Sequence, residues 1–266
     1  FAKRKQLKDK IFIAYCPERV LPGNIMYELV NNDRVIGGIN SKSTIMATKF
    51  YSLFVKGNLH ETDARTAEMC KLVENSSRDV QIAFANELSI VCDKAGINVW
   101  ELIELANKHP RVNILNPGCG VGGHCIAVDP YFIISDFKKE SRLISEARKI
   151  NNFKPQWCLK KIHECIEKFQ RTKNKKPSIA VLGLTFKPNI DDLRESPALK
   201  IAKSLNTKNT YEVFFVEPNV NYVKGIKLTE LQKACIKSDI IVKLVNHREF
   251  LELDLEKKEF IDFCSQ

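Results

Sequence analysis

The stretch Ser178-Ile-Ala-Val-Leu-Gly-Leu184 begins the part of the chain whose fold the sequence predicts best. It is a mostly apolar run that leads into a turn, as expected of a buried strand. A helix is expected next, at 197–205, with Pro197 at its first position and Ser196 as its cap. Further strands are expected at 212–216, 239–245 and 260–263, and further helices at 228–236 and 247–253. Strands alternating with helices at this spacing predict an α/β fold with a small parallel sheet of the Rossmann kind.

The segment before this sheet is predicted to be helical. From Glu61 to Ala95 the sequence contains neither Pro nor Gly, Thr62 is placed to cap the helix, and Gly96 to end it. Apolar residues share one side of this helix: Met69, Val73, Val80, Phe84, Leu88 and Val91. The opposite side carries a polar trio: Lys71, Asn75 and Arg78. The trio is either an ordinary solvated face or a set of groups that hold a hydroxyl and a phosphate.

The remaining elements are expected to be shorter or less regular. Strands are predicted at 11–14 and 35–39, and helices at 41–54, 99–107 and 131–134. A long helix is expected at 141–169, with a possible break at Pro155. The Lys-rich residues 171–176 are expected to mark a domain boundary.

Composition narrows the class of protein. With 266 residues, 44% of them hydrophobic, the chain has room for one large core or two ordinary ones. It has no apolar run long enough to span a membrane, and its first residues have no signal-peptide pattern and no initiator Met, as in a chain entered part-way. Nine irregularly spaced cysteines indicate a reducing cytoplasm. The net charge of +10 is spread over many segments without interleaved aromatics, so no nucleic-acid partner and no membrane partner is expected.

The glycine-rich run from Asn116 to Pro130 is the strongest candidate for chemistry. Four glycines within six residues precede His124, Cys125 and Asp129. A thiol beside a carboxylate on such a loop predicts a covalent catalyst, whereas a plain turn with a buried Cys is the alternative. No fourth ligand accompanies the two cysteines and the histidine, so no metal is expected. The run follows Asn-Pro and not a strand, which argues against a dinucleotide-binding turn.

Two other turns carry charged residues just after predicted strands. Glu18 and Arg19 follow the strand at 11–14, and the turn at 185–197 follows the strand at 178–184. The second turn contains both cations and acids: Lys187, Arg194, Asp191, Asp192 and Glu195. They form either a salt network within the loop or a set of phosphate and ribose contacts.

Together these segments resemble the UDP-glucose/GDP-mannose dehydrogenase family. The resemblance covers nearly the whole chain and is carried by five motifs in order: CPERVLPG (16–23), KLVEN (71–75), FANE (84–87), GCGVGGHCIAVDP (118–130) and GLTFKPNIDDLRESPA (183–198). It implies the end of an NAD-binding Rossmann domain at 1–40, a helical central domain at 41–170 that forms a homodimer, and a UDP-binding α/β domain at 177–266. The fingerprint glycines would then precede Phe1, so a silent fragment that binds a UDP-sugar or only dimerises is an alternative.

The resemblance also implies a reaction, the four-electron oxidation of a sugar C6 alcohol to an acid with two NAD⁺. Lys71, or a water held by Asn75 and Asp129, would take the first proton. Cys125 would form a thiohemiacetal and then a thioester, and Glu18 or Asp129 would activate water for hydrolysis. Variants within the motifs at 16–23 and 118–130 favour UDP-N-acetyl-D-mannosamine as substrate, with UDP-N-acetylglucosamine and UDP-glucose as alternatives.

Further site residues are carried over from the same resemblance. Arg111 would reach across the dimer, and Arg194 would contact the cofactor. The expected substrate contacts are Arg19, Val20, Arg78, His109, Arg111, Gly118, Gly120, Phe186 and Lys187.

Overall fold

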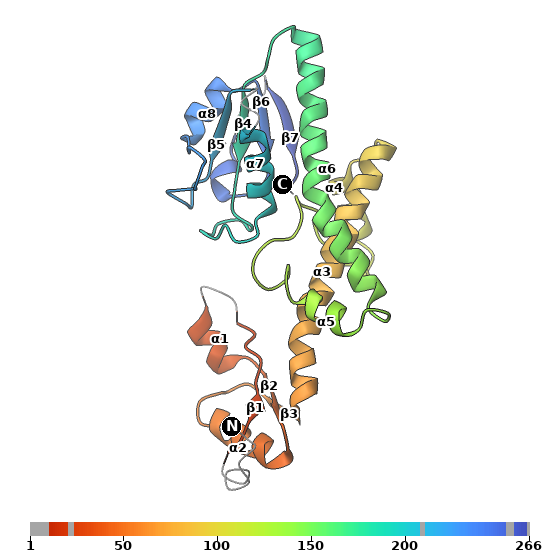
Figure 1. Cartoon of the computed structure of the whole chain (residues 1–266), viewed down its shortest axis with the longest axis vertical. Coiled ribbons are helices and arrows are strands. Elements are labelled where there is room, and N and C mark those ends of the chain that lie inside the picture. Colours follow the sequence, from red (N-terminus) through yellow and green to blue (C-terminus); the bar gives the residue numbers. More distant parts are fainter. Residues whose placement is uncertain (1–10, 21–23, 208–210, 254–257, 265–266) are drawn as a thin grey trace. The chain divides into compact units, whose positions relative to one another are not determined.

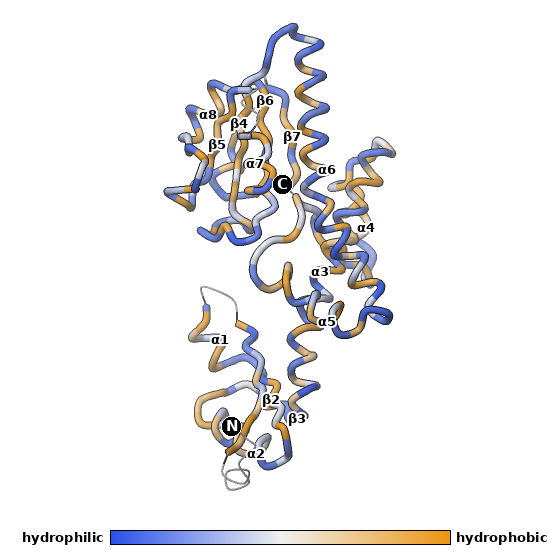
Figure 2. The backbone as a smooth tube through the Cα atoms, viewed as in Figure 1, coloured by the Kyte–Doolittle hydropathy of each residue, from blue (hydrophilic) through white to orange (hydrophobic). Residues whose placement is uncertain are grey.

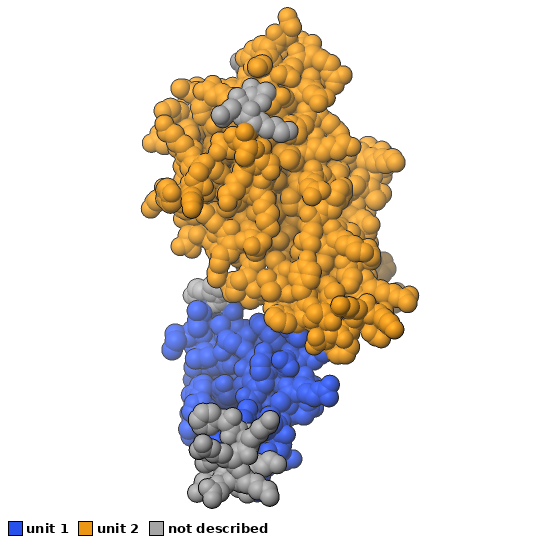
Figure 3. Space-filling model, viewed as in Figure 1, with its two compact units in different colours: residues 1–75 blue, residues 76–266 orange. Residues whose placement is uncertain are grey.

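The structure is a computed structural model that describes residues 11–20, 24–207, 211–253 and 258–264. Leu21, Pro22 and Gly23, the end of one motif, lie outside the described residues. The chain divides into two compact units, residues 1–75 and residues 76–266 (Figure 3). None of the helices in the described ranges has the length and apolarity needed to cross a bilayer.

Unit 1 is built on a small sheet with strand order β1-β2-β3, in which β2 runs antiparallel to β1 and parallel to β3. Its elements are β1 (Ala14–Tyr15), α1 (Ile25–Asn31), β2 (Arg34–Gly38), α2 (Ser41–Tyr51) and β3 (Leu59–Asp63). The predictions of a strand at 35–39 and a helix at 41–54 are confirmed. The strand expected at 11–14 is shorter and lies later, and Phe12 and Ile13 are exposed instead of buried. The elements α1 and β3 were not predicted.

Helix α3 (Ala64–Ala95) confirms the long helix, but not its predicted cap. Thr62 lies in β3, where it pairs with Gly37 of β2. The Asp63 carboxylate caps the helix instead, because it accepts the backbone N–H groups of Arg65 and Thr66 at 3.0 Å each. Gly96 ends the helix with φ +70°, as expected.

The side of α3 that is buried differs from the one that its apolar pattern suggests. Phe84 and Val91 on the apolar side are 55% and 56% exposed. The buried positions hold small or polar residues: Ala67, Ser76, Asp79, Ala83, Ala85, Asn86, Ser89 and Cys92. Asp79, Asn86 and Ser89 can be buried here because they bond to partners on α6, as described below.

The other helices of the middle segment are α4 (Val99–Ala106), α5 (Pro130–Asp136) and α6 (Arg142–Lys173), which confirm the predicted helices. The break that was considered at Pro155 does not occur, since α6 continues through it. Pro155 has no N–H to donate to the carbonyl of Asn151. Gly120 approaches that carbonyl so closely that a Cβ on it would lie 2.9 Å from the oxygen. The glycine loop therefore packs where the proline leaves the helix ladder incomplete.

The rest of unit 2 is a four-stranded parallel sheet with the order β5-β4-β6-β7 (Figure 1). Its elements are β4 (Ile179–Leu182), α7 (Pro197–Asn206), β5 (Val213–Val216), α8 (Leu231–Lys237), β6 (Ile240–Lys243), the 3-10 helix η1 (Arg248–Phe250) and β7 (Glu259–Asp262). The predicted parallel sheet is confirmed. Ser196 caps α7 by accepting the N–H of Leu199 at 3.1 Å, as predicted. The helix expected at 247–253 is a single 3-10 turn.

Both faces of this sheet are covered by helices, which explains why β4 and β5 are apolar throughout and β6 is apolar up to Lys243 (Figure 2). Ile179 and Val181 of β4 pack in a core shared with α6 and α7. Ala180 and Leu182 pack in a second core on the opposite face, with α8 and η1. Because α6 belongs to the first core, the segments on either side of residues 171–176 lie in one compact unit.

Candidate active site

Cys125 lies at the end of the glycine loop, directly before α5. Its carbonyl accepts the N–H groups of Val128 at 2.9 Å and Asp129 at 2.8 Å, so these residues form a turn that leads into the helix at Pro130. The thiol is free and the residue is half-buried. Cys125 is therefore held by main-chain bonds and remains partly accessible.

The glycine loop is fastened to the turn at 185–197 by two glycines. A Cβ on Gly122 would lie 2.6 Å from the Cβ of Phe186 and 2.9 Å from the carbonyl of Glu195. Gly123 has φ +83°, and its N–H donates to the carbonyl of Arg194 at 3.0 Å. A side chain fits at neither position, so the loop needs glycine to lie against the turn. Two predicted site segments, far apart in sequence, are thus brought together.

Arg194 is the cation of this turn that interacts with Cys125. Its guanidinium bonds Asp192, with Nε 3.0 Å from both carboxylate oxygens and NH2 2.6 Å from one of them. These bonds raise the pKa of Arg194, and the charge of Cys125 raises it further. The same bonds lower the pKa of Asp192. A salt network is therefore present in the turn. It is solvent-exposed, since the Arg194 side chain is 62% exposed and can also meet a ligand.

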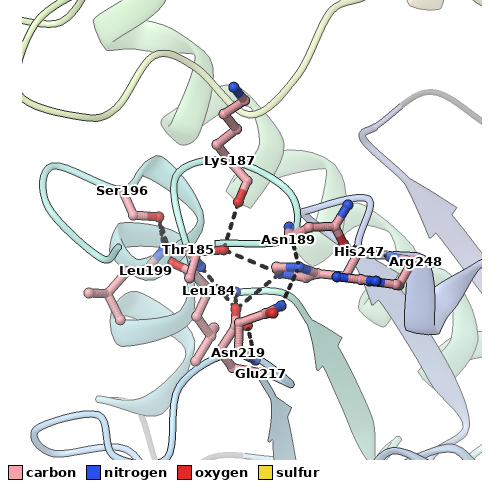
Figure 4. Close-up of polar contacts among 10 residues, drawn as sticks. All are labelled: Leu184, Thr185, Lys187, Asn189, Ser196, Leu199, Glu217, Asn219, His247 and Arg248. Carbon is pink, nitrogen blue, oxygen red and sulfur yellow. Dashed lines mark hydrogen bonds and ion pairs between the residues drawn. The ribbon is translucent and has the colours of Figure 1, made fainter. Parts of the chain in front are cut away.

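The same turn is supported from beneath by Glu217, which follows β5 (Figure 4). One Glu217 carboxylate oxygen accepts the N–H groups of Leu184 at 2.7 Å and Thr185 at 3.0 Å. Burial opposes ionisation of Glu217, but bonds from His247 and from the N–H groups of Leu184 and Asn219 outweigh it, so its pKa is lowered. The carboxylate therefore occupies the main-chain donors at the carboxyl end of β4, where Rossmann sheets often receive phosphate.

His247 completes this support and is fully buried. Its Nδ1 accepts the backbone N–H of Asn189 at 3.0 Å, so the ring proton lies on Nε2 when the imidazole is neutral. Nε2 lies 3.2 Å from both Glu217 and the Thr185 hydroxyl (Figure 4). The network holds residues 185–189, and with them Phe186 and Lys187. Sequence reasoning missed Glu217 and His247, although both follow strands at the edge where α/β proteins place polar groups.

A second buried network supports the start of the glycine loop. The N–H of Gly118 donates to Oδ1 of Asn86 at 2.9 Å, and Asn86 donates to Asn151 at 2.9 Å. Asn151 donates to Asp79 at 2.8 Å, and Asp79 pairs with Arg148 at 2.6 Å. Sequence reasoning missed this network too. The sequence pattern that could have indicated it is the seven-residue spacing of Asp79 and Asn86, which places both on one side of the helix.

The other predicted substrate contacts in unit 2 have different surroundings. Gly120 packs against Asn151, as described above, whereas a Cβ on Gly118 would meet nothing within 4 Å. Arg78 and Lys187 are exposed. His109 and Arg111 are exposed as well, and the N–H of Arg111 donates to Nδ1 of His109 at 3.3 Å. Arg111 also lines a groove of about 730 Å³ that includes Phe84.

Unit 1 brings its own predicted site residues together. The Lys71 ammonium donates to the carbonyl of Glu18 at 3.0 Å. The Glu18 carboxylate accepts from the Arg34 guanidinium at 3.0 and 3.4 Å and from the N–H of Arg19 at 2.9 Å. Arg19 pairs with Glu74 at 2.8 Å. Val20 and Asn75 are half-buried.

A bound NAD would need backbone donors on an open glycine turn. In the described part of unit 1, Gly37 and Gly38 are packed instead: a Cβ on either would lie 2.3 Å from another main-chain atom. The described residues of unit 1 therefore fit NAD only in part. Across the described ranges, no three His, Cys, Asp or Glu side chains are grouped to hold a metal.

Comparisons with known proteins agree with this arrangement. Residues 65–153, 180–262 and 2–55 match, in that order, the central, UDP binding and NAD binding domains of the UDP-glucose/GDP-mannose dehydrogenase family. The chain is 52% identical to a UDP-N-acetyl-D-mannosamine dehydrogenase of Campylobacter jejuni, over 96% of this chain and 62% of that protein. It is 49% identical to an NDP-N-acetyl-D-galactosaminuronic acid dehydrogenase of Ralstonia nicotianae, over 97% of this chain and 60% of that protein.

A solved structure is similar over the same extent. The UDP-D-ManNAc dehydrogenase of Pyrococcus horikoshii superposes with a TM-score of 0.84 at 42% identity, covering 96% of this chain and 61% of that one. The chain thus spans about three-fifths of the length of these relatives. With three domain matches from one family in addition, the chain belongs to the UDP-glucose/GDP-mannose dehydrogenase family.

Proposed function

We propose that the protein containing this chain oxidises the C6 alcohol of UDP-N-acetyl-D-mannosamine to the carboxylic acid, with Cys125 as the covalent nucleophile. The observation that carries the proposal is the contact of the Cys125 loop with the Phe186–Arg194 turn through Gly122 and Gly123. This contact puts a half-buried thiol beside cations suited to a nucleotide-sugar.

The proposed covalent step uses the thiolate of Cys125. The sulfur attacks the C6 aldehyde carbon, and the thiohemiacetal that forms keeps the half-oxidised sugar bound. NAD⁺, when bound, supplies hydride acceptance for the two oxidations. Water then releases the acid from the thioester and returns the thiol.

Lys71 is proposed to stabilise the oxyanion that develops at C6, or to take the first hydroxyl proton, and Asn75 to hold a water with Asp129. We assign activation of the hydrolytic water to Asp129 and not to Glu18. Asp129 is bonded through its N–H to Cys125. The oxygens of Glu18 already accept bonds from the buried Arg34 and from the N–H of Arg19, so they are less available to a water.

Substrate binding is assigned to these candidates: Arg19, Val20, Arg78, His109, Arg111, Gly118, Phe186 and Lys187. Gly120 acts through packing, since its neighbours are Asn151 and Pro155. Arg194 is proposed to contact the cofactor.

The sugar is assigned as N-acetylmannosamine because relatives with that name are 52% identical over most of this chain. A relative named for an N-acetylgalactosaminuronic acid is almost as similar, at 49%. We therefore expect turnover to be fastest with UDP-N-acetyl-D-mannosamine. The assay should compare it with UDP-N-acetylgalactosamine, UDP-N-acetylglucosamine and UDP-glucose.

A homodimer through the central helices is also proposed. The support is the unburied apolar side of α3, where Phe84 and Val91 are more than half exposed. Arg111 lies in the groove beside Phe84, so it is placed to reach a partner's site. We further propose a cytoplasmic location, because all nine cysteines are free thiols.

The decisive test is Cys125→Ser in the protein that contains this chain. We expect acid formation to be lost, by at least about 10³-fold, while the folded protein still binds UDP. The measurements are NADH formation, product analysis and calorimetric binding of UDP. Cys165→Ser, a half-buried thiol on α6, is the matched control and should retain activity. Normal acid production by Cys125→Ser would exclude the covalent scheme.

Binding alone can be tested on this chain. A UDP-sugar should protect Cys125, but not Cys165, from alkylation by iodoacetamide, as followed by peptide mass spectrometry. Protection without turnover by the isolated chain would fit a binding fragment. Absence of protection would count against the assigned site.

A further inference from the structure

A second cavity in unit 2 has features of a ligand site. Its volume is about 380 Å³, within the range of small-molecule sites, and α3, α4, α6 and β7 all contribute to it. Trp100, Trp157 and Phe263 supply aromatic surface. Of the glycine-rich run 116–130 only Pro117, near its start, lines the cavity, and none of the lining residues belongs to the turn at 185–197.

The cavity contains a buried cation. Lys154 of α6 is 2% exposed, and its ammonium lies 3.9 Å from the centre of the Trp157 ring. The ammonium donates to the hydroxyl of Ser89, which also lines the cavity. Within the described part of the chain, no carboxylate forms an ion pair with Lys154, which is unusual for a buried charge.

The acids of the cavity are already neutralised by other lysines. Asp93 pairs with Lys161 at 3.1 Å, and Asp262 pairs with Lys243 at 2.8 Å. The Lys161 and Asp93 side chains are 30% and 38% exposed, which places this pair at the mouth. Lys154 therefore remains as the uncompensated charge of the lining. Its pKa is lowered by burial, as expected of an ammonium without a counter-ion.

We infer that this cavity binds a small aromatic carboxylate or phosphate, with the anionic group against Lys154 and the ring among Trp100, Trp157 and Phe263. The anion would supply the charge that Lys154 lacks, and the ammonium, which has further N–H groups beside the one that bonds Ser89, would donate to it. The ring would pack against Trp100 and Trp157, which are partly exposed. This is a ligand site additional to the proposed UDP-sugar site.

The chain contains its own reporter for this site. It has two tryptophans, and both line the cavity. Titration of the chain with benzoate or phenyl phosphate should give a saturable change in tryptophan fluorescence. Benzamide, which has the same ring without the charge, should bind at least about tenfold more weakly, because it lacks a charge-assisted hydrogen bond. The two anionic probes separate a carboxylate site from a phosphate site.

Variants locate the binding. Lys154→Met should weaken the binding of benzoate or phenyl phosphate by at least about tenfold, and Lys154→Arg should retain binding. Lys160→Met is the matched control, because Lys160 lies on the same helix, is 74% exposed and does not line the cavity. Circular dichroism checks folding. Should Lys154→Met not fold, the comparison of benzoate with benzamide on the unmodified chain still decides.

Three results would overturn the inference. The first is equal affinity for benzoate and benzamide, and the second is unchanged anion binding by folded Lys154→Met. The third is competitive displacement of the probe by UDP, which would assign the cavity to the nucleotide site. Loss of probe binding would leave the Cys125 alkylation test unaffected, so the two proposals fail separately.

Discussion

Gly122 lies at the contact between the Cys125 loop and the turn that carries Phe186. Because a Cβ there would come within 2.6 Å of one side chain and 2.9 Å of a main-chain oxygen, Gly122→Ala must move the loop away from the turn. We expect it to cost about 1–3 kcal/mol of stability and to weaken UDP binding. Urea unfolding and calorimetry measure the two effects.

Gly118 supplies the matched control for this prediction. It is in the same loop, but a Cβ on it would meet no atom within 4 Å. Gly118→Ala should therefore leave stability nearly unchanged. Equal losses of stability from the two substitutions would show that the contact at Gly122 does not decide how the loop lies.

At the scale of elements, α3 and α6 are joined by a buried ion pair. The side chains of Asp79 and Arg148 are 0% and 4% exposed. Asp79→Ala should cost about 3–5 kcal/mol in the free energy of unfolding, because it leaves the guanidinium buried without its partner. The double variant Asp79→Leu, Arg148→Met should cost less than this single variant. A urea-unfolding cycle tests the order, and a single-variant cost below about 1 kcal/mol would contradict it.

The edge of the parallel sheet provides a prediction about pH. The pKa of Glu217 is lower in the folded chain than the usual value of about 4.3. Its stabilising contribution is therefore complete above that pH and is lost as the pH falls towards the folded pKa. The unfolding free energy of the wild type minus that of Glu217→Gln should shrink between pH 6 and about pH 3. A difference independent of pH would show that the carboxylate charge is not involved.

Elements fixed by local rules could be predicted from the sequence. Ser196 and Pro197 define the start of α7, and Gly96 defines the end of α3. The short strand β3 was missed because its residues, Leu59–Asp63, are mostly polar and pair along one side only.

The candidate site likewise contains residues that the sequence identified and residues that it could not identify. Motifs identified Cys125, Phe186 and Arg194, and the loop contacts among these segments are present. Glu217 and His247 could not be found from motifs, since their partners are main-chain groups set by the sheet. The buried side of α3 could not be predicted from apolar spacing, because Asp79 and Asn86 are buried through bonds to another helix.

At the scale of the whole molecule, the exposed side of α3 predicts association. Phe84→Asp should convert the proposed dimer to a monomer, because it places a charge on apolar surface that a partner would cover. Sedimentation equilibrium measures the mass. Tyr222→Asp, a change at a 73% exposed residue of the sheet segment, should leave the dimer intact. A monomeric wild-type chain would contradict the assignment.

The carboxylate of Glu217 has a consequence for how nucleotides are recognised. It accepts hydrogen bonds from the N–H groups of Leu184 and Thr185. In many Rossmann-type sheets the main-chain N–H groups at this position bind a phosphate of the ligand instead. We therefore expect the diphosphate of UDP to be bound by the proposed contact Lys187, a long side chain, and not by rigid amide dipoles. Affinity for UDP should for that reason decline steeply with ionic strength.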